Sequence, residues 1–374
     1  MVWEAKMKNE AISERQAIIL IILFILGNSL LIGSGNQAKQ DSWVAIIIAI
    51  SWSIIVLLMY SRILSLYPGK DLFDILQIIM GKFIGKIISI LMIWFAFHTG
   101  TLVLRVLSDF TNTIVFADTP VIMPMIFFTI LLIWSLKAGI EVLGRWAEFF
   151  SWVVILIIII VPVLSISQMD ISRLKPILSN GVTPVLKGAF SSFTFPFGQT
   201  VIFTMVFSNI SKVKNHKKTF IVGLFVGGGL ILLTSLRNLL VLGSKTVNGL
   251  YFQSTMSVGL IRLGFLQRLE MTVIIVFLVC AFIKISICIF AVCNGISKVF
   301  AFEDYKFIAT PATLLMLSFS FFIFKSTMET HFWISNVLSY YSFPFEVIIP
   351  LFIFIVAEIR NRSSTSPIFI KKPN

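Results

Sequence analysis

The sequence predicts an all-α polytopic membrane protein, and three observations carry that prediction. Of the 374 residues, 57% are hydrophobic and only 13% are charged, whereas a typical soluble chain has about 25% charged residues. Apolar stretches of about 20 residues, the length that crosses a bilayer as a helix, recur along the whole chain. Glycine and proline interrupt two of these stretches. We therefore expect one transmembrane domain over residues 1–374, built partly from discontinuous helices.

Ten spans are predicted from the apolar stretches. An even number places both termini on one side of the membrane. If that side is the cytoplasm, 19 of the 30 Lys and Arg residues lie there and 9 lie outside, with the other two inside spans. Cytoplasmic loops carry the basic excess in membrane proteins, so both termini are predicted to be cytoplasmic, with 360–374 as a tail. The spans cover approximately residues 15–36, 43–64, 83–107, 121–137, 146–166, 186–208, 219–243, 269–299, 307–325 and 334–359.

The net charge of +13 is explained by basic loops beside anionic lipid, so we expect a lipid membrane and no nucleic acid as partner. The chain has no CxxC, HExxH or phosphate-loop motif, and no Ser–His–Asp arrangement can be argued. Cys280, Cys288 and Cys293 share one apolar stretch and are expected to be small apolar fillers. We predict no enzyme, no cofactor and no metal site.

The sixth span breaks in the middle of the stretch 190–207. Pro196 has no N–H to donate and Gly198 disfavours a helix, so a helix that enters here is expected to stop and restart. Hydrocarbon cannot satisfy the freed backbone groups, so such a break is stable only when it is buried in protein or lines a polar cavity. The alternatives are a kinked packing helix or a turn between two short helices.

The first span is interrupted as well, by Gly27, Asn28 and Ser29 and then by Gly33 and Gly35. Glycine can also serve close helix packing. However, the interruptions fall in spans one and six of ten. Two five-span halves, 15–166 and 186–359, that each open with a discontinuous helix are typical of an inverted-repeat transporter. This pattern favours a solute cavity at the two breaks.

A polar stripe marks one face of the third span: His98, Thr101, Arg105, Ser108 and Asn112 follow each other in steps of three and four residues. Such a stripe is expected to face protein or water instead of lipid. His98 is a candidate ligand-binding residue, although a lone buried histidine is more often structural.

Lys284 lies midway along the eighth span. A buried ammonium is costly, and it either pairs with an acceptor or loses its proton. Lys284 is therefore a candidate fixed cation in place of a sodium ion, or a titrating group. The alternative is a structural partner of a carboxylate, for which Glu346 in the tenth span is a candidate counter-ion.

These residues together resemble the spore germination permease family, the B subunits of Ger-type germinant receptors, within the amino acid–polyamine–organocation transporter superfamily. The similarity covers nearly the whole chain, and its order and spacing are more specific than any one motif. The matching stretches are 38–43 (Ala-Lys-Gln-Asp-Ser-Trp), 139–148 (Gly-Ile-Glu-Val-Leu-Gly-Arg-Trp-Ala-Glu), 195–199 (Phe-Pro-Phe-Gly-Gln), 268–270 (Arg-Leu-Glu) and 282–284 (Phe-Ile-Lys).

The resemblance implies a leucine-transporter-like fold of ten helices with a small-molecule site between spans one, three, six and eight. It also implies soluble-domain A and lipoprotein C partner subunits in the inner membrane of the spore. Two departures from the family matter: Gln199 stands where many relatives have glutamate, and Gly33 and Gly35 stand where many have proline. The predicted ligand-binding residues are Gly27, Asn28, Ser29, His98, Thr101, Phe195, Pro196, Phe197, Gly198, Gln199 and Lys284.

The leading hypothesis is a receptor subunit that binds a small nutrient, such as an amino acid, and signals germination through its partner subunits. The main alternative is a proton- or sodium-coupled amino acid permease that works alone. A third is a water or ion conduit, although the sequence has no ring of pore-lining charges.

Overall fold

The computed structural model describes residues 12–116, 118–207, 215–261 and 269–365, and every regular element in these ranges is a helix. The all-α prediction is therefore confirmed. The long helices are α2 (Glu14–Leu26), α4 (Ser42–Leu66), α5 (Leu72–Phe110), α6 (Ile122–Ala138), α7 (Ile140–Leu164), α8 (Val182–Ser192), α9 (His216–Leu242), α12 (Glu270–Phe300), α13 (Lys306–Phe322) and α16 (Ile349–Thr365). The shorter ones are α3 (Ser29–Ile32), η1 (Asn36–Asp41), η2 (Thr111–Val115), η3 (Ile166–Gln168), η4 (Ile171–Leu174), η5 (Phe193–Phe197), η6 (Gly198–Met205), α10 (Ser244–Gly249), α11 (Gln253–Gly259), α14 (Thr327–Asn336), α15 (Leu338–Phe343) and η8 (Pro344–Ile348).

Several helical stretches are long and apolar enough to cross a membrane. Within the described residues there are seven, or eight if α13 and α14, which meet at a bend of 100°, form one span. The apolar helix α6 has 17 residues and is shorter than these. The predicted span 186–208 contains no single long helix because the chain breaks around Pro196. The total of ten spans therefore remains a prediction.

Several predicted boundaries shift, and α7, for example, begins at Ile140 and not at residue 146. The third predicted span, 83–107, lies inside the longer α5, which has a kink at Gly81, where φ is 77°. The last span was predicted to end at residue 359, but α16 continues to Thr365. The rest of the predicted tail, residues 366–374, lies outside the described residues, as does residue 208 at the end of the sixth span.

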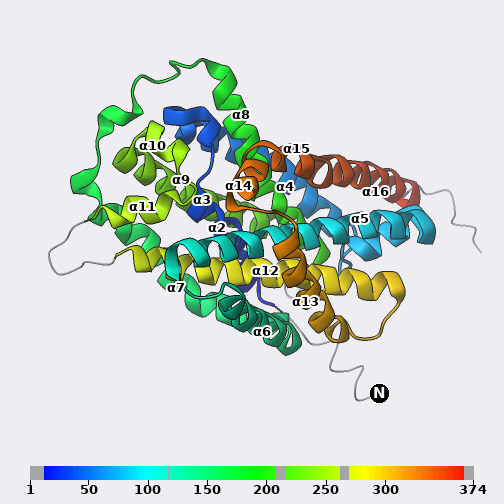
Figure 1. Ribbon diagram of the computed structural model, residues 1–374. Coiled ribbons are helices and arrows are strands. Elements are labelled where there is room, and N and C mark those ends of the chain that lie inside the picture. Colours follow the sequence, from blue (N-terminus) through cyan, green and yellow to red (C-terminus); the bar gives the residue numbers. More distant parts are fainter. Residues whose placement is uncertain (1–11, 117, 208–214, 262–268, 366–374) are drawn as a thin grey trace, which may run out of the picture.

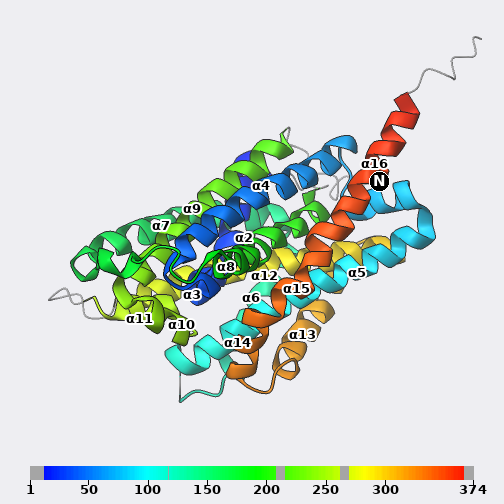
Figure 2. The same cartoon turned by 90° about the horizontal axis from the view of Figure 1, so that it is seen from above.

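Helices α2 and α12 form the centre of the molecule. In their most apolar stretches, 83% of the α2 residues and 78% of the α12 residues are buried, against 33% for α4 and α7. A helix that is apolar on all sides is expected in such a central position. Figures 1 and 2 show α12 and α5 running side by side, and α2 also packs against α12.

The outer helices present large apolar side chains to their surroundings. Phe127 on α6, Phe149 and Trp152 on α7, and Ile55 on α4 are each at least 66% exposed. A soluble monomer rarely exposes so much apolar surface, whereas a lipid bilayer covers it favourably. The exposed face therefore fits an integral membrane protein.

Three short helices, α3, α10 and α11, lie together at one end of the molecule in both views (Figures 1 and 2). The hydroxyl of Ser254 on α11 donates a hydrogen bond to the carbonyl of Leu30 on α3. Asn238 on α9 donates in turn to Ser254, with an Nδ2–Oγ distance of 3.1 Å. These contacts hold the second half of the broken first helix against α9 and α11.

Candidate functional site

The ammonium group of Lys284 bridges the two broken helices. Its Nζ atom lies 2.7 Å from Oε1 of Gln199, in the first turn of η6, and 3.5 Å from Oδ1 of Asn28, between α2 and α3. Lys284 is completely buried, and both amides are 2% exposed. A hydrogen bond from a charged donor is stronger than one between neutral groups. The two interruptions, at Asn28 and Gln199, are 171 positions apart in the sequence and meet at one lysine.

Two aromatic rings complete the surroundings of this ammonium. Nζ of Lys284 lies 4.9 Å from the ring centroid of Phe24 and 5.1 Å from that of Phe195. A cation within about 6 Å of an aromatic face is attracted to the π electrons, most strongly when it is desolvated. The lysine is thus stabilised as a cation by amide oxygens and rings.

Gly27 leaves room for the lysine side chain. It ends α2 with a φ of 20°, and a Cβ atom at this position would lie 2.6 Å from Cδ of Lys284 and 2.9 Å from the carbonyl oxygen of Phe24. Residues that carry a side chain rarely adopt this φ, and Cβ atoms in proteins essentially never approach a non-bonded atom so closely. Glycine is therefore required here both by the backbone and by Lys284.

Gly198 has a comparable role at the second break. A Cβ atom there would lie 2.2 Å from Oε2 of Glu346, which is fully buried on η8. The hydroxyl of Tyr60 on α4 donates to the backbone carbonyl of Glu346 and lies 3.4 Å from that of Gly198. The break in the sixth span thus packs tightly against the tenth.

Side-chain hydroxyls satisfy many of the carbonyls that the breaks release. The Ser29 hydroxyl lies 2.7 Å from the carbonyl oxygen of Ile25 and 2.8 Å from that of Leu26. On η6, Thr200 and Thr204 likewise donate to carbonyls three residues earlier, with distances of 2.7 and 2.6 Å. Such local bonds compensate a disrupted helix in an apolar surrounding. These backbone carbonyls near the breaks are therefore already hydrogen-bonded.

A cavity of about 350 Å³ adjoins the breaks on the side of α3 and η1. Phe195 belongs both to its wall and to the surroundings of Lys284, so this residue adjoins both the cavity and the ammonium. Gln37 spans the wall, with its Nε2 3.3 Å from Oγ of Ser191 and 3.1 Å from the carbonyl of Ser335. The lining residues are Ile32, Gly33, Ser34, Gly35, Asn36, Gln37, Lys39, Ser191, Phe195, Asn248, His331, Ile334, Ser335 and Asn336.

The predicted site residues on the third span lie elsewhere. The imidazole of His98 packs among aromatic rings, with centroid distances of 4.8 Å to Tyr341, 5.1 Å to Trp333 and 5.8 Å to Trp94. Thr101 donates to the carbonyl of Phe97 in its own helix at 2.9 Å. Neither residue is among those that line the cavity. Pro196 and Phe197 are buried in the second break, where the peptide bond that precedes Pro196 is cis.

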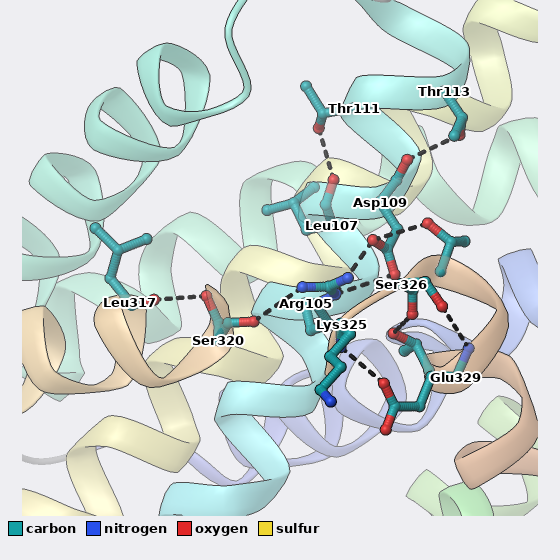
Figure 3. A network of polar contacts seen from close by, with 12 residues as sticks. Arg105, Leu107, Asp109, Thr111, Thr113, Leu317, Ser320, Lys325, Ser326 and Glu329 are labelled. Atoms are coloured by element: carbon teal, nitrogen blue, oxygen red, sulfur yellow. Dashed lines mark hydrogen bonds and ion pairs between the residues drawn. The ribbon is translucent and has the colours of Figure 1, made fainter. Parts of the chain in front are cut away.

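The polar stripe of α5 leads to a separate network. His98 and Thr101 are buried as predicted, Arg105 and Ser108 are buried as well, and Asn112 is exposed. Figure 3 shows Arg105 beside Asp109, with an Nε–Oδ1 distance of 3.2 Å, and near the carbonyl of Ser320 on α13. Asp109 also accepts a hydrogen bond of 3.1 Å from Thr327 at the start of α14. The arginine is therefore part of an ion pair that holds the bend between α13 and α14 against α5.

Two residues of the site, Phe24 and Tyr60, were not among the predicted ones. Phe24 lies one helical turn before Gly27, so its ring is on the same side of α2 as the break. Tyr60 is the sole tyrosine in the apolar stretch 43–64, and a buried hydroxyl needs a hydrogen-bond partner. Both signals are weak in a chain that has 37 phenylalanines and many apolar helices.

The chain is similar to proteins of one family along most of its length. A sequence profile described as spore germination protein, the spore permease family, matches residues 11–332. Spore germination protein KB of Bacillus subtilis (strain 168) is 30% identical over 366 residues, which are 95% of this chain and 97% of that protein. Spore germination protein YndE of the same organism is 23% identical over 302 residues, 77% of this chain and 81% of the relative.

The fold is similar to that of a solved transporter. Mhp1, a nucleobase-cation-symport-1 family transporter in a closed conformation with bromovinylhydantoin bound, aligns with a TM-score of 0.68 at 12% sequence identity. The alignment covers 94% of this chain and 79% of Mhp1. Mhp1 has the leucine-transporter fold, and the fold class predicted from the sequence is thereby confirmed.

Proposed function

The chain belongs to the spore germination protein family, and from this premise we propose that it is the membrane subunit of a germinant receptor. It binds a small nutrient of the amino acid type at the two helix breaks and signals germination through A and C partner subunits. Its place is the inner membrane of the spore, with both termini in the cytoplasm. Family and fold favour a receptor or transporter over an enzyme.

The observation that carries this proposal is the position of Lys284 next to Phe195, which also lines the cavity. The buried cation meets both broken helices, and the ring of Phe195 is shared between it and the cavity of about 350 Å³. A ligand site of the transporter type needs a hollow with a few polar groups that fix orientation. The carboxylate of an amino acid would be attracted to Lys284, and the amides of Asn28 and Gln199 would supply further hydrogen bonds.

Access to Lys284 requires Phe195 to move, since the lysine is fully buried in this arrangement. We therefore expect nutrient binding to favour an arrangement in which the ring has left the ammonium. A ligand shifts such an equilibrium only by its difference in affinity for the two states. Displacement of η5 would be transmitted to α15 and α4, which pack against it. Partner subunits in contact with these helices would respond to that shift.

A nutrient screen tests the proposal. Spores that carry this protein in their sole receptor are exposed to single amino acids, and loss of refractility is followed. Lys284→Met is expected to abolish the response, whereas Lys217→Met, which changes an exposed lysine at the start of α9, should leave it intact. An equal response of both variants to every nutrient that activates the wild type would contradict the role of Lys284.

The fold of a solved transporter supports a second candidate, an amino acid permease that works alone. Uptake distinguishes the two functions. Proteoliposomes that contain this chain by itself are loaded with a sodium or proton gradient, and accumulation of labelled amino acids is measured. Sustained accumulation above that of empty liposomes would support the permease, while nutrient-dependent germination without accumulation would support the receptor.

A further inference from the structure

Glu346 is a buried carboxyl group for which the fold supplies no hydrogen-bond donor. Its side chain is completely buried on η8, and neither Oε1 nor Oε2 has a hydrogen-bond partner among the described residues. An ionised carboxylate is acceptor-only and needs donors when it is removed from water. Tyr60 does not supply a donor, because its hydroxyl donates to the backbone carbonyl of Glu346 and not to its side chain.

The nearby cation does not pair with this carboxyl group directly. Lys284 contacts Gln199 and Glu346 packs on the neighbouring Gly198, but the hydrogen bonds of the ammonium go to the neutral amides of Gln199 and Asn28. An ionised Glu346 beside Lys284 would be expected to take one of these hydrogen bonds, since a charge-assisted pair is the stronger one. This arrangement of hydrogen bonds favours a neutral acid at Glu346.

The other contacts that η8 makes within the described residues are with uncharged groups, as on α5, where the ring of Phe95 stacks on Phe345 at 5.0 Å. Among the described residues, Lys284 on α12 is the charged group that acts on Glu346, and Tyr60 on α4 is a neutral phenol whose hydroxyl donates to the backbone carbonyl of Glu346. Helix η6 contributes Gly198 at this contact, and α15 has tyrosines and no charged residue. On α16 the first charged residue is Glu358, twelve positions further along the chain.

The site is also too tight for a metal cation in place of a proton. A single Cβ atom at Gly198 would already lie 2.2 Å from Oε2 and 2.6 Å from Cδ of Glu346. None of the cavities described near the breaks is lined by Glu346. A proton needs no such space. We propose that Glu346 is a proton-binding site, which holds a proton in this arrangement and exchanges it with water when the break at Gly198 opens.

This inference is independent of the nutrient. When the proton leaves for water, the carboxylate and Lys284 form a neutral pair, so the charge of the helix-break region falls from one to zero. The tight contact with Gly198 is lost when η6 moves away from η8, and water can then supply the donors that the carboxylate needs. Proton release is thereby coupled to the position of the broken sixth helix.

Infrared spectroscopy of the full-length protein in lipid nanodiscs at neutral pH tests the proposal without any ligand. The wild type is expected to show the C=O stretch of a protonated carboxylic acid, and this band should shift in D₂O. Glu346→Gln should lose the band. Glu358→Gln is the control: it removes a carboxyl group on α16 that lies 2.7 Å from Nε of Arg62, and this variant should retain the band.

Glu346→Asp keeps a carboxyl group and serves if the Gln variant does not fold; its band should appear at a different frequency. A wild type without the band, or a band unchanged in both Glu346 variants, would overturn the proposal. A band that is lost in Glu346→Gln but does not shift in D₂O would also overturn it, because the proton would then be permanently bound.

Discussion

The Nζ atom of Lys284 lies 2.7 Å from Oε1 of Gln199, although the two residues are 85 positions apart in the sequence. This contact joins α12 to the second break, and the same ammonium reaches Asn28 in the first break. The two helix breaks and the buried helix α12 are thus linked through one charged side chain. Substitution of Lys284 and substitution of its partners should have effects that can be measured separately.

Gln199→Leu is expected to destabilise the protein, because Lys284 then keeps only the long hydrogen bond to Asn28. A hydrogen bond to a charged group contributes about 1.5–3 kcal/mol, and thermal unfolding in detergent, followed by tryptophan fluorescence, measures the change. The double variant Gln199→Leu/Lys284→Met should lose less than the sum of the two single variants. If the losses of stability in the two single variants add strictly in the double variant, the hydrogen bond between Lys284 and Gln199 does not contribute to stability.

Gly27→Ala should lower stability by about 1–3 kcal/mol, since the added methyl group meets Lys284 and the backbone conformation is unfavourable for alanine. Gly229→Ala is the matched control: it lies in the helix α9 and a Cβ atom there meets nothing within 4 Å. That control should be neutral or stabilised by up to about 1 kcal/mol. If both variants unfold at the wild-type temperature, this result contradicts the close packing of Gly27 against Lys284.

The cavity between η1, α8 and α14 should be reachable from the outer face of the membrane. Cysteine introduced as Ser191→Cys or Ser335→Cys, both in the cavity wall, is expected to react with a membrane-impermeant thiol reagent added outside. The native Cys280, Cys288 and Cys293 are buried and should not react.

Ser286→Cys is the control for this labelling, because Ser286 is fully buried on α12. Mass spectrometry of right-side-out vesicles gives the extent of modification. Labelling in inside-out vesicles but not in right-side-out vesicles would contradict the predicted orientation of the termini. Equal labelling of Ser286→Cys would show that access is not specific to the cavity.

Arg105→Met should destabilise the protein by about 3–5 kcal/mol, because it leaves the buried carboxylate of Asp109 without its cation. The double variant Arg105→Met/Asp109→Asn removes both charges and should recover part of this loss. Thermal unfolding of the purified protein again provides the measurement. Arg62→Met, which breaks a more exposed pair with Glu358, should cost about 1 kcal/mol or less.

The position of the breaks could be predicted from the sequence because proline and glycine act locally. Pro196 cannot donate a backbone hydrogen bond and Gly27 permits an unusual φ, whatever surrounds them. The polar stripe on α5 was predicted equally well, since helical periodicity places Arg105 and Ser108 on one buried face. Arg105 and Asp109 are four positions apart, a spacing that brings side chains together on a helix, but no pattern indicated that this pair would hold the bend near Thr327.

The sequence by itself therefore determined the membrane class, the two interrupted helices and the buried lysine, because hydrophobicity and backbone chemistry are properties of short stretches. Only the tertiary structure decided that Lys284 binds Gln199 and Asn28, that Glu346 packs on Gly198, and that His98 lies apart among aromatic rings. Contacts between helices depend on the packing of side chains that are distant in the chain, and in a sequence so uniformly apolar many packings satisfy the same pattern.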